Sequence, residues 1–99
     1  MTQLAVQFST HNCASSKPLE EYALKKLETV ARHFNNILDV KFTFDVLGEH
    51  RHKASVICHV PKHKLFADFT GEDMYGAIDK VVDKLDKLVR EHKDRMRSH

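Results

Sequence analysis

The last third of the sequence places the tightest limit on the fold, because one segment carries both a long apolar stripe and a separate line of cations. At about 100° per residue, nine side chains gather on one broad side of a helix expected over residues 72–97. They are Met74, Ile78, Val81, Val82, Leu85, Leu88, Val89, His92 and Met96. Lys80, Lys84 and Lys87 lie almost opposite them, about one turn apart. Such a helix must bury its stripe against another layer and expose its lysines to solvent.

The rest of the chain predicts four strands and a second helix. Alternation of apolar and polar residues predicts strands over residues 3–9, 38–47, 52–60 and 63–70. The alternation is clearest where Val40, Phe42 and Phe44 point inward. Residues 10–17 are expected to form a loop before a helix over residues 18–34, with Ser16 as its N-cap. Turns are predicted at residues 48–51 and 61–62.

This order predicts an α+β fold, a β-α-β-β-β-α two-layer sandwich in one domain over residues 1–99. Each helix has one apolar stripe, so both should pack on one face of a four-stranded sheet. Short turns join the last three strands, which are expected to form an antiparallel meander. The first strand precedes a helical crossover and is expected to pair parallel with a neighbour.

Composition limits the classes of protein that the chain can belong to. It has 41% hydrophobic and 30% charged residues, a formal net charge of +2 and a pI near 8.6. These values fit a globular domain, and the small net charge does not by itself indicate nucleic-acid binding. No apolar run reaches the ~20 residues that span a bilayer, and the N-terminus does not resemble a secretory signal. We therefore expect a cytoplasmic protein in which Cys13 and Cys58 are free thiols.

The sequence contains no recognisable catalytic or metal-binding pattern. It lacks a glycine-rich phosphate loop and a nucleophile motif, so we expect neither an enzyme nor a cofactor. His50, His52, His59 and His63 lie in or near the predicted hairpins. Strand alternation places His52 and His59 on opposite faces, and no metal site is expected.

The two predicted helices could instead present a basic surface. Lys25, Lys26 and Arg32 lie off the apolar stripe of the helix over residues 18–34. If the helices pack side by side, these cations and those of the last helix would form one surface able to contact phosphates without base identity. The alternative is a solvated helix laced with salt bridges, because Asp79, Asp83, Asp86, Glu91 and Asp94 are interleaved with the lysines.

The start of the last helix carries the residues of a family resemblance. From Glu72 the chain reads E-D-M-Y-G-A-I-D, and from Val82 it reads V-D-K-L. This string resembles the signature of the ribosome hibernation-promoting factors, also called protein Y, YfiA or sigma-54 modulation proteins. The helix over residues 18–34 and the order of elements are similar to the family along nearly the whole chain. The chain resembles the short form of the family.

The resemblance implies a fold like that of a double-stranded RNA-binding domain and a non-enzymatic role. Family members bind the small ribosomal subunit between head and body, fill the mRNA and tRNA decoding channel, and inhibit translation under stress or in stationary phase. Carried over by position, the resemblance implies RNA contacts from Lys26, Arg32, Lys84, Lys87 and Arg90. The helical projection adds Lys25, Lys80 and Lys93.

The same resemblance implies a set of partners. They are the small ribosomal subunit with its ribosomal RNA and, in addition, a second hibernation factor. No membrane and no small-molecule substrate are expected, and the chain is expected to be a monomer off the ribosome. Thr29 and Glu91 stand where relatives commonly carry basic residues, which weakens the predicted surface.

Two other interpretations remain open from the sequence. The older family name implies a protein-interaction module that modulates sigma-54-dependent transcription. A basic surface that reads only phosphates would also suit a general binder of duplex RNA.

Overall fold

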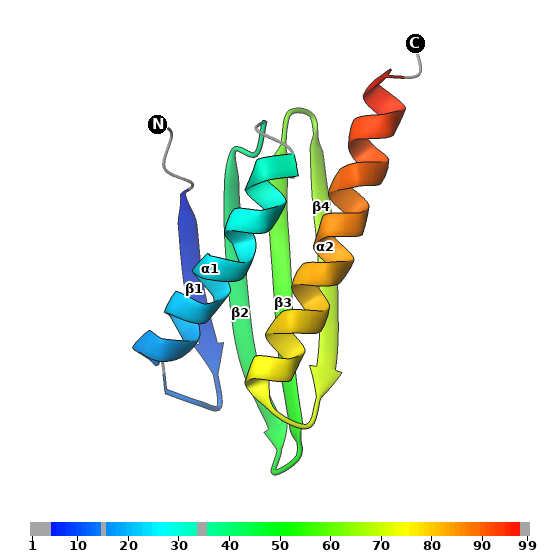
Figure 1. Ribbon diagram of the computed structural model, residues 1–99. Helices are drawn as coiled ribbons and strands as arrows, with labels where there is room; N and C mark the ends of the chain where they lie inside the picture. The colour runs from blue at the N-terminus through cyan, green and yellow to red at the C-terminus, as the bar shows by residue number, and fades with distance from the viewer. Residues whose placement is uncertain (1–4, 15, 34–35, 98–99) are drawn as a thin grey trace.

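The structure is a computed structural model that describes residues 5–14, 16–33 and 36–97 of the 99-residue chain (Figure 1). The elements run in the predicted order: β1 Val6–His11, α1 Lys17–His33, β2 Asp39–Gly48, β3 Arg51–Val60, β4 His63–Gly71 and α2 Met74–Arg97. Neither helix is long and apolar enough, over the residues described, to cross a membrane.

The four strands form one mixed sheet in the order β1-β2-β3-β4. The strand β1 pairs parallel with β2, and β2, β3 and β4 form an antiparallel meander. Parallel pairing of β1 with β2 requires a crossover, which α1 provides. The α+β β-α-β-β-β-α fold is therefore confirmed, together with the predicted direction of every strand pair.

Both helices lie side by side on the same face of the sheet (Figure 1). The core fills the space between the two layers. Strand alternation brings Val40, Phe42 and Phe44 of β2 into this core, and the helical period brings Ala23, Leu27 and Val30 of α1 onto it. The stripe of α2 predicted from the sequence is buried along Ile78, Val81, Val82, Leu85, Val89 and His92, whereas Leu88 is only half-buried.

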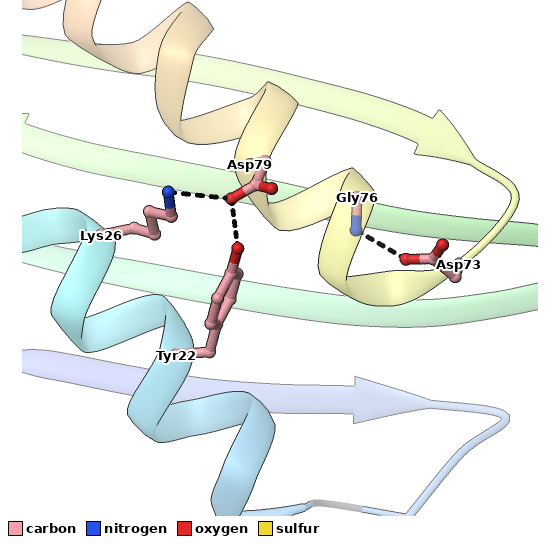
Figure 2. A network of polar contacts seen from close by, with 5 residues as sticks. All are labelled: Tyr22, Lys26, Asp73, Gly76 and Asp79. Carbon is pink, nitrogen blue, oxygen red and sulfur yellow. Dashed lines mark hydrogen bonds and ion pairs between the residues drawn. The ribbon is translucent and has the colours of Figure 1, made fainter.

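Several predicted boundaries differ from the structure, most of them by one residue. Thr10 and His11 continue β1 instead of opening a loop, because they pair in register with Phe44 and Asp45 of β2. The helix α2 begins at Met74, two residues later than predicted. Asp73 occupies the N-cap position, where its Oδ1 accepts the Gly76 N–H at 2.7 Å (Figure 2). The helix α1 extends over Lys17–His33, and residues 3, 4 and 34 of the predicted elements lie outside the described residues.

Candidate nucleic-acid interface

The candidate interface is the outward side of α1 and α2, which we call the helical face. The sequence predicts eight cations for this face, namely Lys25, Lys26, Arg32, Lys80, Lys84, Lys87, Arg90 and Lys93. The charge of the helices is mixed: α2 has seven basic and five acidic residues, and α1 has four basic and three acidic residues. The arrangement of these charges therefore decides what the face can bind.

Seven of the eight predicted cations are exposed to solvent, and four of these seven have no side-chain partner among the described residues. Lys25 and Arg32 each follow a buried core residue by two positions, which at about 100° per residue turns them away from the sheet. Lys80 and Lys87 are likewise exposed on α2. Within the described part of the chain, none of these four forms an ion pair or a side-chain hydrogen bond. Their ammonium and guanidinium groups are available to an anionic partner.

The other four predicted cations are engaged with the protein to different degrees. Arg90 pairs with Asp86 one turn earlier at 2.7 Å, and Lys26 pairs with Asp79 of the other helix at 3.3 Å. Lys93 is half-buried. Lys84 turns to the edge of the sheet, where its Nζ donates to the Asp68 carbonyl at 3.0 Å. Its Nζ also lies 5.5 Å from the centre of the Phe69 ring.

The two helices are joined by a polar network that the sequence reasoning missed. The Tyr22 hydroxyl of α1 donates to Oδ1 of Asp79 of α2 at 2.7 Å, and Lys26 Nζ approaches the same oxygen (Figure 2). Tyr22 also packs edge-on against Tyr75 at a centroid distance of 5.0 Å. The only signal in the sequence is that Tyr22 and Lys26, four residues apart, share one side of a helix. Their partner lies 57 and 53 residues away, so only tertiary packing reveals it.

Protonation in this network follows from the hydrogen bonds. The hydrogen bond to Asp79 is the main reason why the pKa of Tyr22 is raised, and burial and the Asp79 charge add to it. The same carboxylate raises the pKa of Lys26, first through its hydrogen bond and then through its charge. Both groups therefore keep their protons at neutral pH and remain donors.

The opposite face of the sheet provides a contrast. Lys53 pairs with Asp68 at 3.6 Å, and His59 pairs with Asp39. Phe66, which the sequence reasoning did not place, is 56% exposed beside Ile57 of the neighbouring strand. Alternation with buried Leu65 and Ala67 was the available signal for it. This face therefore mixes both charges around a small apolar patch.

Catalytic and metal chemistry find no support in the described residues. They contain no cluster of three or more histidine, cysteine or acidic side chains able to hold a metal ion. Cys58 is fully buried, and burial raises the pKa of its thiol to about 11. Cys13 is also a free thiol, as predicted.

Comparison with known proteins gives consistent matches. Residues 6–97 match the family described as "Sigma 54 modulation protein / S30EA ribosomal protein". The chain is 33% identical to a ribosome hibernation promoting factor of Pseudomonas putida, covering 96% of this chain and 92% of that protein. It is 27% identical to a factor of the same name from Escherichia coli K12, covering 97% and 100% of the two chains.

Two solved structures share the fold. A ribosomal subunit interface protein from Coxiella burnetii superposes with a TM-score of 0.85 at 20% identity, over 92% of this chain and 99% of that one. The N-terminal domain of Thermus thermophilus protein Y superposes with a TM-score of 0.81 at 21% identity, over 91% and 99%. The chain therefore belongs to the sigma 54 modulation / S30EA ribosomal protein family, the non-enzymatic ribosome hibernation promoting factors, and matches their short form along its length.

Proposed function

We propose that this protein binds the small ribosomal subunit in the mRNA and tRNA decoding channel and inhibits translation under stress or in stationary phase. The partner is ribosomal RNA, and the protein acts in the cytoplasm. The observation that supports this most strongly is a set of exposed cations on two adjacent helices that have no ion pair with any described residue, in a chain of the hibernation-factor family. They are Lys25, Arg32, Lys80 and Lys87.

The proposed mechanism is occupancy of the channel, held by contacts to phosphates. Lysine and arginine side chains that approach RNA release condensed counterions, and this release favours binding whatever the base sequence. Binding is expected to exclude mRNA and tRNA by volume, with no chemical step. Arg90, Lys26, Lys84 and Lys93 would contribute where a phosphate can compete with their present partners.

Charge reversal on α2 tests the assigned face. The double variant Lys80→Glu with Lys87→Glu should weaken small-subunit binding by at least about tenfold near 0.1 M salt and relieve inhibition of in vitro translation. Lys84 is omitted because its bond to the Asp68 carbonyl ties it to the sheet edge. The matched control is Lys41→Glu with Lys64→Glu, which makes the same charge change at exposed positions on the opposite face of the sheet.

Salt dependence gives a second readout of the same proposal. With four to six phosphate contacts, affinity for small subunits should fall roughly 10²–10³-fold over a fourfold rise in salt. Equal weakening in both double variants, or binding that ignores salt, would reject the helical face as the interface.

The two rival functions predict other partners. A modulator of sigma-54-dependent transcription would be recovered with RNA polymerase and would not co-sediment with ribosomes from starved cells. A general duplex-RNA binder would bind free RNA helices as tightly as it binds small subunits.

A further inference from the structure

Between α1 and α2, two hydrogen-bond donors converge on one anionic oxygen. The Tyr22 hydroxyl lies 2.7 Å and the Lys26 Nζ 3.3 Å from Oδ1 of Asp79 (Figure 2). A charged donor and a hydroxyl donor aimed at a single oxygen form the usual pattern for binding an anion. In this structure the anion is a side chain of the protein itself.

The site is held in place yet remains open to solvent. The Lys26 and Asp79 side chains are 45% and 42% exposed, so an anion approaching the helical face can reach both. Packing of Tyr22 against Tyr75 and of Lys26 over the Tyr22 ring, with 5.6 Å from Nζ to the ring centre, keeps the donors in position. An incoming anion would therefore meet a preformed pair of donors.

A phosphate oxygen is chemically equivalent to the carboxylate oxygen as an acceptor. Both are anionic and accept short, charge-assisted hydrogen bonds from lysine and hydroxyl groups. If a phosphate takes over these donors, Asp79 loses its partners and its charge repels the newcomer. Asp79 must therefore reduce the affinity that Lys26 and Tyr22 could otherwise provide.

We infer that Lys26 and Tyr22 form a subsite for an RNA backbone phosphate, and that Asp79 occupies this subsite in the free protein as an internal competitor. The inference rests on the proposed function in that the helical face is the one that meets RNA. Asp79 is a positioning residue here, since it acts through Lys26 and Tyr22. On binding, Lys26 must leave Asp79 to contact the phosphate. Binding is therefore weaker and less salt-dependent than it would be if Asp79 did not compete.

Replacing Asp79 separates this competitor role from a purely structural one. Asp79→Asn keeps an oxygen that can accept the Tyr22 hydrogen bond and removes the charge. Its Kd for small subunits should tighten about two- to fivefold, the range expected when one surface ion pair no longer competes. The slope of log K against log salt concentration should become steeper by about one. The reason is that the Asp79→Asn variant has no carboxylate at this position, so no cation from solution is taken up there when Lys26 moves to the phosphate. At the same time its midpoint in urea unfolding should fall, since the tie between the helices is weakened.

Asp83→Asn is the matched control. It makes the same charge change on α2 at an exposed carboxylate that acts on Lys26 through its charge but forms no ion pair or hydrogen bond with another described residue. This control should tighten binding less than twofold, which is the general effect of one fewer negative charge. In the Lys26→Met background, Asp79→Asn should lose its advantage. Tyr22→Phe should weaken binding about two- to threefold, because one of the two donors is gone.

Several results would overturn the inference. They are weaker binding by Asp79→Asn, tightening no greater than that of Asp83→Asn, or an advantage that survives Lys26→Met. If Asp79 had a purely structural role, Asp79→Asn would lower both affinity and stability. If Asp79 is a competitor, the same substitution raises affinity and lowers stability.

A second probe, a duplex fragment of ribosomal RNA, separates this inference from the proposed function. If wild-type protein fails to bind small subunits while Asp79→Asn still tightens binding to the fragment through Lys26, the proposed function is wrong and the subsite stands. If wild-type protein binds subunits and Asp79→Asn gives no gain with either probe, the function stands and the subsite is wrong.

Discussion

At the scale of single residues, the tight turn between β3 and β4 holds Lys62 in a backbone conformation that its side chain disfavours. Lys62 adopts a φ of 69°, in the left-handed region that L side chains disfavour. It follows Pro61 in the two-residue turn between β3 and β4, and Val60 pairs with His63 across that turn. Proline at the first central position and positive φ at the second correspond to a type II turn, whose second position favours glycine.

Lys62→Gly is therefore expected to stabilise the protein. Relief of the left-handed strain, partly offset by the greater entropy of glycine in the unfolded chain, should raise the free energy of unfolding by about 0.5–1 kcal/mol. Urea unfolding followed by circular dichroism measures the change. Lys62→Ala is the control, because it shortens the side chain and keeps the Cβ. If the glycine variant were no more stable than the alanine variant, the backbone at position 62 would not be strained.

At the scale of elements, α2 serves both the core and the helical face. Its apolar side packs on β3 and β4, and its last turns bring His92 against His63 at the start of β4, with 5.2 Å between ring centroids. His92 is 6% exposed. Burial lowers the pKa of His92, and the neighbouring His63 and Arg95 lower it further.

This histidine predicts a loss of stability in acid. Because the folded pKa of His92 lies below the unfolded value of 6.5, the unfolded chain takes up its proton first as the pH falls. The contribution of His92 to stability is present above pH 6.5 and is lost as the pH falls from there toward the folded pKa. Urea midpoints between about pH 7 and pH 5 should fall in wild-type protein and fall less in His92→Phe. His50→Gln, in the exposed β2–β3 turn, should behave as wild type; identical slopes in all three proteins would reject the assignment.

At the scale of the whole molecule, the two layers separate stability from binding. Phe42 lies fully buried in the core, with its ring 5.8 Å from Phe8 of β1 and 5.9 Å from Phe44. Phe42 therefore packs β2 against β1 in the core beneath the helices. The cations of the helical face make no contribution to this cluster, so the two properties should respond to different substitutions.

Phe42→Ala should lower the free energy of unfolding by about 3–5 kcal/mol, because it leaves a cavity in the core. Phe66→Ala, on the open face of the sheet where the ring is 56% exposed, should change it by less than about 0.5 kcal/mol. Below the unfolding temperature of Phe42→Ala, the folded fraction should bind small subunits as wild type does. Similar losses in the two alanine variants would mean that Phe42 is not central to the core.

The sequence by itself determined the elements, their order and which sides are buried. Alternation around Phe42 and the helical spacing around Ile78 are properties of near neighbours in the chain, and burial follows directly from them. Sequence periodicity could also show that Lys80 and Lys87 lie away from the stripe. The motif beginning at Glu72 indicated the family, which the matches then confirmed.

Only the tertiary structure decided which partners the cations have. Lys26 meets Asp79, and Lys84 meets the Asp68 carbonyl, because packing of the helices and the sheet brings these atoms within a few ångströms. Such pairings join residues 53 and 16 positions apart, and no local period encodes them. A charged side chain can reach several partners around its helix, so its choice depends on the distance and angle between whole elements. The periodicity of a sequence specifies buried faces, whereas the contacts made by exposed charges depend on how those faces are packed together.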